Sequence, residues 1–254
     1  MSPVVPPPRA ASLFGPTSSL PDYEHPPVVE VVLCVHWESP LAEVGEIARN
    51  LQPTLGAEWT VAPEAEHGVW TLNNLLQDGR IRLGRQALSV SWLGYEGGRY
   101  PHYESLRDSF VAAWVALQGC RSELKAAAWS VGYINRIPQG TVWQTPADWT
   151  FCRLIPPLQI PTSATGVSQL SLRWTWPLRD DRGELTADVS QGPAVEGQPD
   201  CLWLSLRSAG PATDCETGLL DGLDFGRQTI VRTFRELMTP EANAYWGLLG
   251  RPTP

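Results

Sequence analysis

The residues of this sequence that could do acid–base chemistry are few, and the first two lie on one predicted strand. Glu30 and His36 share a face of the β-branched segment 28–37 (VVEVVLCVHW). At about 3.3 Å per residue they are separated by about 20 Å, which is too far for an acid–base pair. A carboxylate in an apolar strand needs a partner. We therefore expect Glu30 to pair with Arg136 or Arg173, or to serve a site completed by other strands.

Two further polar side chains lie in the predicted strand 129–138 (WSVGYINRIP). Asn135 shares its face with Tyr133, and on this otherwise apolar face it needs buried hydrogen-bond partners or faces a cavity. Arg136 points to the opposite face, where its planar guanidinium suits an anion, a carboxylate or an ion pair that closes the sheet. An enzyme whose site assembles around Glu30, Asn135 and Arg136 is one hypothesis for the function.

No motif of catalytic spacing is present in the sequence. It contains neither a P-loop, a dinucleotide-binding glycine pattern, a G-x-S-x-G turn nor an H-E-x-x-H pair. The histidines show no metal-ligand spacing, and the five cysteines are scattered, odd in number and without a zinc or redox pair. We expect no metal and no cofactor, and cysteines that are free thiols packed as small hydrophobic residues.

Twelve tryptophans are the outlier of the composition. Alternation places Trp174 and Trp176 on one face of a predicted strand, with Trp203 on a neighbouring strand. These rings either fill a sheet core or line a ligand cleft or partner surface, where aromatic residues concentrate binding energy. The candidate ligand- or partner-binding residues are Trp174, Trp176, Trp203, Tyr133, Asn135, Arg136 and Glu30.

Charge and hydropathy exclude several classes of protein. The chain of 254 residues has a formal net charge of -8, which disfavours nucleic acid as a partner because phosphate binding needs concentrated Lys and Arg. No run approaches the ~20 apolar residues that cross a bilayer. Residues 1–21 form a Pro-rich tail without the features of a secretory signal. We expect a soluble, cytosolic protein.

Hydrophobic periodicity predicts an α+β fold of two pseudo-repeated units, each a strand, a crossover, a three-stranded meander and a helix. These units would form one antiparallel, sheet-rich body with long helices packed on it. We expect residues 22–254 to be a single globular domain with halves at about 22–122 and 123–254. The predicted strands are 28–37, 69–77, 80–84, 86–94, 129–138, 169–176, 184–190 and 201–208, and the predicted long helices are 103–118 and 217–237.

Three local signals refine this prediction. Ser39 followed by Pro40 predicts the start of a helix in the first crossover. Thr239-Pro240-Glu241 predicts a short last helix for the same reason. In the second crossover, one short strand is expected near 151–155.

Several segments together resemble a sporadically distributed, uncharacterised bacterial family of about this length. The segments are LPDYEHPPVVEVVL (20–33), YPHYESLRDSF (100–110), YINRI (133–137) and LLDGLDFGRQTIVRTFRELMTPEANAYWG (219–247). The resemblance covers nearly everything from Leu20 to Gly247. It implies a bacterial, cytosolic protein with no established activity, of the accessory kind found in defence and specialised-metabolism loci.

The sequence leaves three functions open. The first is a non-catalytic interaction or accessory subunit of a bacterial multiprotein system, with a protein partner encoded nearby. The second is a small-molecule binding protein with a Trp-lined pocket, and the third is the enzyme described above. The ligand, the partner and the oligomeric state do not follow from the sequence.

Overall fold

The computed structural model describes residues 20–62, 68–74, 76, 78–94, 100–157, 169–192, 199–213 and 218–249. The strands in these residues are β1 (Asp22–Tyr23), β2 (Val28–His36), β3 (Trp59–Val61), β4 (Trp70–Asn74), β5 (Gly79–Leu83), β6 (Ala87–Leu93), β7 (Ala128–Pro138), β8 (Ser171–Pro177), β9 (Glu184–Gln191), β10 (Cys201–Pro211) and β11 (Leu248–Leu249). The helices are α1 (Val44–Leu55), α2 (Tyr103–Cys120), α3 (Gly218–Leu237) and α4 (Pro240–Tyr245), with 3₁₀ turns at Pro146–Phe151 and Arg179–Asp181.

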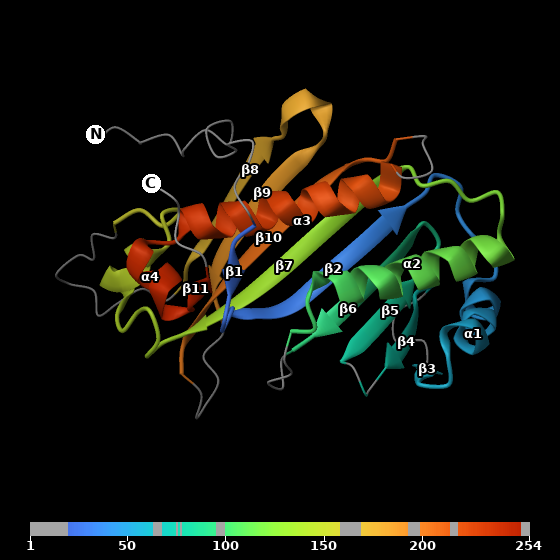
Figure 1. The fold of residues 1–254 in the computed structure, drawn as a ribbon, viewed down its shortest axis with the longest axis horizontal. Helices are drawn as coiled ribbons and strands as arrows, with labels where there is room; N and C mark the ends of the chain where they lie inside the picture. The colour runs from blue at the N-terminus through green and yellow to red at the C-terminus, as the bar shows by residue number, and fades with distance from the viewer. Residues whose placement is uncertain are drawn as a thin grey trace. The chain divides into compact units, whose positions relative to one another are not determined.

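The protein is α+β, as the sequence predicts, and its main sheet is antiparallel (Figure 1). Among the described residues this sheet has nine strands in the order β3-β4-β5-β6-β2-β7-β10-β9-β8, and β1 pairs with β11 in a small second sheet. The described helices include none that is long and apolar enough to cross a membrane. The predicted tail falls mostly on residues 1–19, which lie outside the described part of the chain.

Two compact units divide the chain, and each takes segments that are distant in sequence. One, called here the 28–133 unit, consists of Val28–Tyr133 and Ala209–Gly226. The other, the 134–208 unit, consists of Met1–Pro27, Ile134–Ser208 and Arg227–Pro254. The predicted structural duplication stays a prediction.

Alternation of apolar and polar residues builds the sheet of the 28–133 unit. Val31 pairs with Trp92 and Leu33 pairs with Val90 across the β2–β6 ladder, and these side chains are almost fully buried. The pair Asp78-Gly79 is a hairpin signal in the sequence, and β4 and β5 do pair as antiparallel neighbours. The turn does not lie at Asp78-Gly79 itself, because Gly79 is the first residue of β5 and pairs with Asn74, whereas Asp78 before it is left-handed (φ 50°).

The first helix begins later than the sequence predicts. α1 starts at Val44 behind a left-handed Glu43 (φ 54°), and not at Ser39-Pro40. The backbone N–H of Trp37 donates to Gln86 O and that of Leu41 donates to Arg85 O. These bonds hold residues 37–41 beside the connection between β5 and β6. The backbone of this segment therefore pairs with residues 85 and 86 and does not start a helix.

The second crossover also differs from its prediction. In place of a strand at 151–155, a 3₁₀ turn covers Pro146–Phe151, and the strand-like pairing near it is a single bridge between Cys152 and Met238. A capping box between Thr145 and Asp148 starts this turn. In contrast, the predicted cap of the last helix is confirmed, since Ala242 N donates to Thr239 Oγ1 at 3.3 Å.

A close approach fixes the start of α3 on β7. The ring of Trp129 is 2% exposed, and its Nε1 donates to Pro211 O at 3.0 Å. A Cβ built on Gly222 or Gly226 would overlap this ring. The two glycines are therefore required by packing, because any larger residue would push the helix off the strand.

Gly222→Ala tests this contact, because its effect should oppose helix propensity. Alanine inside a helix normally stabilises by about 1 kcal/mol relative to glycine, but here it would collide with Trp129. We expect a net loss of about 1–3 kcal/mol in the free energy of unfolding, measured by urea denaturation.

Gly119→Ala in α2 is the matched control, since a Cβ at that position meets nothing within 4 Å. This variant should be as stable as the unchanged protein or slightly more so. A Gly222→Ala variant as stable as Gly119→Ala would contradict the proposed packing.

Candidate functional site

The two polar residues of the YINRI strand point to opposite faces of β7. Asn135 is buried and its Nδ2 donates to Leu204 O at 3.1 Å, which satisfies the requirement that a buried amide be hydrogen-bonded. Arg136 lies on the other, half-buried face. Side chains on opposite faces of one strand do not converge on a substrate, so this geometry gives the enzyme hypothesis no support.

Glu30 and His36 lie on the half-buried face of β2, as the alternation predicts. Glu30 stands opposite Leu93 and His36 opposite Ala87. Arg173, one of the cations expected for Glu30, binds Asp188 on the neighbouring strand through both carboxylate oxygens, with Nη2 to Oδ2 at 3.1 Å. Because this pair is exposed, it contributes little to stability.

The tryptophans of the second meander lie at the end of the sheet. Trp174 and Trp176 on β8 are half-buried and stand opposite the buried Ala187 and Leu185 of β9. Trp203 alternates along β10 with buried leucines and is itself half-buried. None of the three lines the pocket described below, and they stay candidates for a partner surface.

Tyr133 belongs to an aromatic cluster in the 28–133 unit. It is 8% exposed, and its hydroxyl lies 3.1 Å from that of Tyr100. The Tyr100 ring in turn lies 5.4 Å from that of Trp92. This setting is that of a core side chain whose polar tip has a partner.

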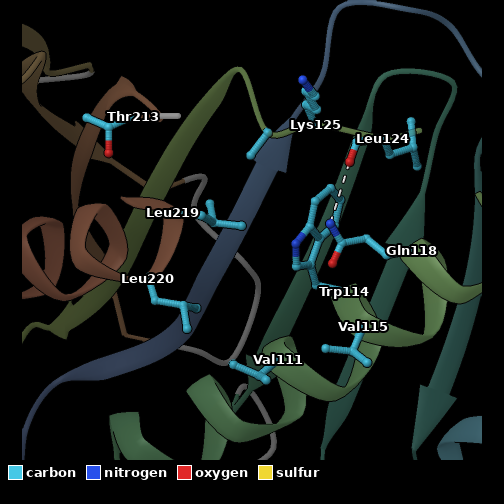
Figure 2. Close-up of a pocket in the computed structure, with 10 residues that line it drawn as sticks. Val111, Trp114, Val115, Gln118, Leu124, Lys125, Thr213, Leu219 and Leu220 are labelled. Atoms are coloured by element: carbon cyan, nitrogen blue, oxygen red, sulfur yellow. Dashed lines mark hydrogen bonds between the residues drawn. The ribbon is translucent and has the colours of Figure 1, made fainter. Parts of the chain in front are cut away.

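A groove of about 550 Å³ lies among the described residues of the 28–133 unit. Figure 2 shows residues of α2 on one side and the first turn of α3 on the other, with the 124–126 segment at one end. The lining is mostly apolar and consists of Val111, Trp114, Val115, Gln118, Leu124, Lys125, Ala126, Thr213, Leu219 and Leu220.

The α2 side of this groove has side chains that contact the core and one side chain that is exposed. The Trp114 ring lies against that of Trp37, with centroids 6.2 Å apart, and Gln118 Nε2 donates to Leu124 O at 3.5 Å. Val115 is 59% exposed although it is a large apolar residue. Val115 is therefore the exposed apolar residue of a groove whose Trp114 is itself buried.

The distance between α2 and the start of α3 is set by one carboxylate, Asp224. Tyr103 Oη donates to Asp224 Oδ1 at 2.8 Å, and Arg107 Nε donates to the same oxygen at 2.9 Å. Burial raises the pKa of Tyr103 strongly, and the hydrogen bond to Asp224 raises it further. The tyrosine is therefore a neutral donor to the carboxylate at any ordinary pH.

The surroundings of the groove are mostly acidic. Glu104 lies about two turns before Val111 on α2, Asp108 lies about two turns before Val115, and both are exposed. Glu123 precedes Leu124 on the chain, and Asp221 follows Leu220. Two basic residues lie in the same segment as Leu124: Arg121, and Lys125, an exposed residue at the end of the groove and the only lysine in the sequence.

Sequence reasoning missed this groove, although a signal for it was present. Apolar spacing in the predicted 103–118 helix indicates a buried side formed by Leu106, Phe110, Trp114 and Leu117, and all four residues are buried. Val111 and Val115 are apolar residues four apart that fall outside this stripe. An apolar pair beyond the core-facing stripe is the pattern that could have revealed a second surface.

No metal centre accompanies the groove: the described residues contain no group of three or more His, Cys, Asp or Glu side chains placed to hold an ion. His67, one of the histidines considered above, lies outside the described residues. No family model matches the chain, and no curated protein is similar to it.

The buried tyrosine makes stability depend on alkaline pH. Because folding raises the pKa of Tyr103, the unfolded chain loses its phenolic proton first, at its ordinary pKa of about 10. The free energy of unfolding should then fall by at most about 1.4 kcal/mol per pH unit above that value. Tyr103→Phe should remove the part of this fall in the free energy of unfolding that comes from Tyr103. Urea denaturation at pH 9 to 11 measures the difference.

Tyr245→Phe is the control, because Tyr245 is 54% exposed. Some alkaline loss should remain in both variants, since burial also raises the pKa of Tyr23. An identical pH dependence of Tyr103→Phe and Tyr245→Phe would contradict the role given to Tyr103.

Proposed function

We propose that this protein is a non-catalytic interaction subunit whose α2–α3 groove receives apolar side chains of a protein partner. The observation that carries the proposal is Val115, which is 59% exposed on the wall of a mostly apolar groove of about 550 Å³. Burying a side chain of this size is worth about 1.5–3 kcal/mol. A partner that covers it gains that free energy, and the small set of apolar residues around it would form the centre of an interface.

Charge supports a cationic partner. The chain carries a formal net charge of -8, and exposed carboxylates, among them Asp108 and Asp221, lie on the helices that form the groove. Complementary charge accelerates encounter and excludes like-charged competitors. We therefore expect a partner that presents apolar side chains bordered by Arg or Lys.

A rigid groove favours binding because less order has to be gained on association. The Asp224 hydrogen bonds from Tyr103 and Arg107 hold α2 against α3 before any partner arrives. Pre-organised walls reduce the entropy lost on binding. This arrangement suits a subunit with a dedicated partner, as the resemblance to a bacterial accessory family implies, acting in the cytosol.

A small molecule is the second candidate for the same groove. Its volume of about 550 Å³ lies within the range of about 300–1,000 Å³ that is usual for ligand sites. Lys125 would then pair with an acidic group of an apolar ligand. The aromatic anion 1-anilinonaphthalene-8-sulfonate is a suitable probe, and its saturable binding, lost in Lys125→Glu, would favour this candidate over a protein partner.

The predicted duplication belongs to the proposal as well. Two similar sheet-and-helix units would explain why the chain has one helix for each meander, and why the groove forms where α2 meets the first turn of α3. The element order of strand, crossover, meander and helix in β2–α2 and in β7–α3 supports this idea.

Val115→Glu is the sharpest test of the interaction proposal. We expect it to weaken partner binding at least 10-fold, because the new carboxylate would have to be desolvated when the partner covers this position. The single lysine gives the assay: an amine-reactive photo-crosslinker placed on Lys125 captures a partner at the groove from a lysate of the source cells, and mass spectrometry identifies it.

Two controls make the result specific. Leu76→Glu introduces the same charge at another exposed apolar residue of the 28–133 unit, 85% exposed, and should leave capture unchanged. Lys125→Arg removes the label from the groove and should abolish it. A captured protein that survives Val115→Glu, or a chain that stays a solitary monomer in native mass spectrometry of the lysate, would overturn the proposal.

A further inference from the structure

The half-buried face of β2 carries a thiol and an imidazole in direct contact. Cys34 Sγ lies 3.3 Å from His36 Nε2. The two residues are two apart on one strand, so their side chains point to the same face. Cys34 and His36 are both half-buried, whereas Leu33 and Val35 between and beside them are fully buried on the other face. The pair is thus held in place by a dry core and still reaches solvent.

The strand register shows which groups surround the pair. Cys34 stands opposite Ser89 of β6, and Ser89 stands opposite Arg82 of β5, so the three side chains form a row on the same face. In the next row, Val32 stands opposite Ser91, and Ser91 opposite Arg80.

The other neighbours complete the charges on this face. Glu30 lies four residues before Cys34 on the same strand, about 13 Å away at about 3.3 Å per residue. On the other side, β7 begins beside His36, whose carbonyl oxygen accepts from Ala127 N. In this unit, the β7 residues on the same face as Cys34 are Ala128, Ser130 and Gly132, and all three are uncharged. Glu38 follows His36 by two residues, so the charged residues named around the pair are two arginines, Arg80 and Arg82, and two glutamates, Glu30 and Glu38. The imidazole of His36 is therefore the group that can take the proton of Cys34 directly.

We propose that Cys34 is a nucleophilic thiol served by His36, and that it is a covalent modification site for soft electrophiles such as hydroperoxides or activated carbon centres. The thiolate is the nucleophilic form of cysteine, and an adjacent imidazole is the usual group that generates it. This site is separate from the α2–α3 groove and does not depend on a partner occupying it.

The chemical step is balanced without a cofactor. The proton of Cys34 Sγ moves to His36 Nε2, and the thiolate attacks the electrophile. With a hydroperoxide, an S–O bond forms and the O–O bond breaks; sulfur is oxidised to a sulfenic acid, the peroxide is reduced, and the leaving oxygen takes the proton from His36. With an alkyl iodide, an S–C bond forms, the C–I bond breaks, and iodide leaves.

Alkylation of the intact protein with iodoacetamide, followed by peptide mass spectrometry, tests the proposal. Cys120 is the internal control, because it is the other half-buried free cysteine of the described residues, whereas Cys152 and Cys201 are buried. We expect Cys34 to react roughly 3- to 10-fold faster than Cys120 at pH 7. An ordinary thiol loses about tenfold in rate per pH unit below a pKa of about 8.5, and Cys34 should lose clearly less between pH 8 and pH 7.

His36→Gln should reduce the rate of Cys34 to that of Cys120 and restore the ordinary tenfold dependence on pH, while leaving Cys120 unchanged. If this variant does not fold, the pH dependence measured on the unchanged protein still decides the question. A second experiment treats the protein with hydrogen peroxide and dimedone, which forms an adduct with sulfenic acids. A dimedone adduct on Cys34 would show that hydroperoxides react with it, and its absence would limit the site to carbon electrophiles. Equal rates and equal pH dependence of Cys34 and Cys120 would overturn the proposal.

Discussion

The contact between Trp129 and the backbone of α3 is the constraint on which the described part of the 28–133 unit depends most. The indole is buried against Gly222 and Gly226 and hydrogen-bonded to Pro211 O. A buried tryptophan with its N–H satisfied is costly to move. Because Gly222 and Gly226 have no Cβ, the helix can pack closely against the Trp129 ring on β7. Leu219, Leu220 and Asp224 project from this same stretch of helix. The groove wall and the hydrogen bonds of Asp224 therefore both follow from where Trp129 sits.

The groove lies between α2 and the start of α3, which are joined by hydrogen bonds at one end and leave an open space at the other. Asp224 joins Tyr103 and Arg107 near the start of α2. Near the end of α2, Trp114 turns inward onto Trp37, so Val115 is left at the surface. The exposed Val115 on this groove is the observation behind our proposal that a partner binds here.

The two faces of the sheet in the 28–133 unit have different chemistry because strand residues alternate. Val31, Leu33 and Val35 close a dry core. The residues between them keep partial access to water, and there the register brings a cysteine beside a histidine and in a row with an arginine. Because one face of β2 packs in the core, its other face can carry polar side chains such as Cys34 and His36.

The sequence by itself determined the elements that depend on short-range chemistry. The 28–37 strand, the antiparallel pairing of β4 with β5, the buried stripe of α2 and the Thr239 cap follow from alternation, backbone preference and capping, which act over a few residues. It also indicated that Asn135 needs a buried partner and that the polar residues of the YINRI strand face opposite ways. The prediction of a helix start at Ser39-Pro40 was wrong, because Trp37 N and Leu41 N donate hydrogen bonds to the carbonyl oxygens of the distant residues Gln86 and Arg85 and hold that segment.

Only the tertiary structure decided where the candidate sites lie. Neither the meeting of Asp224 with Tyr103, 121 residues away in the chain, nor the exposure of Val115 can be read from local patterns. The sequence placed the aromatic site at Trp174, Trp176 and Trp203 because these residues are conspicuous by type. The groove depends instead on which side chains of two helices are left uncovered, and that is settled by long-range packing, which single-sequence periodicity does not encode.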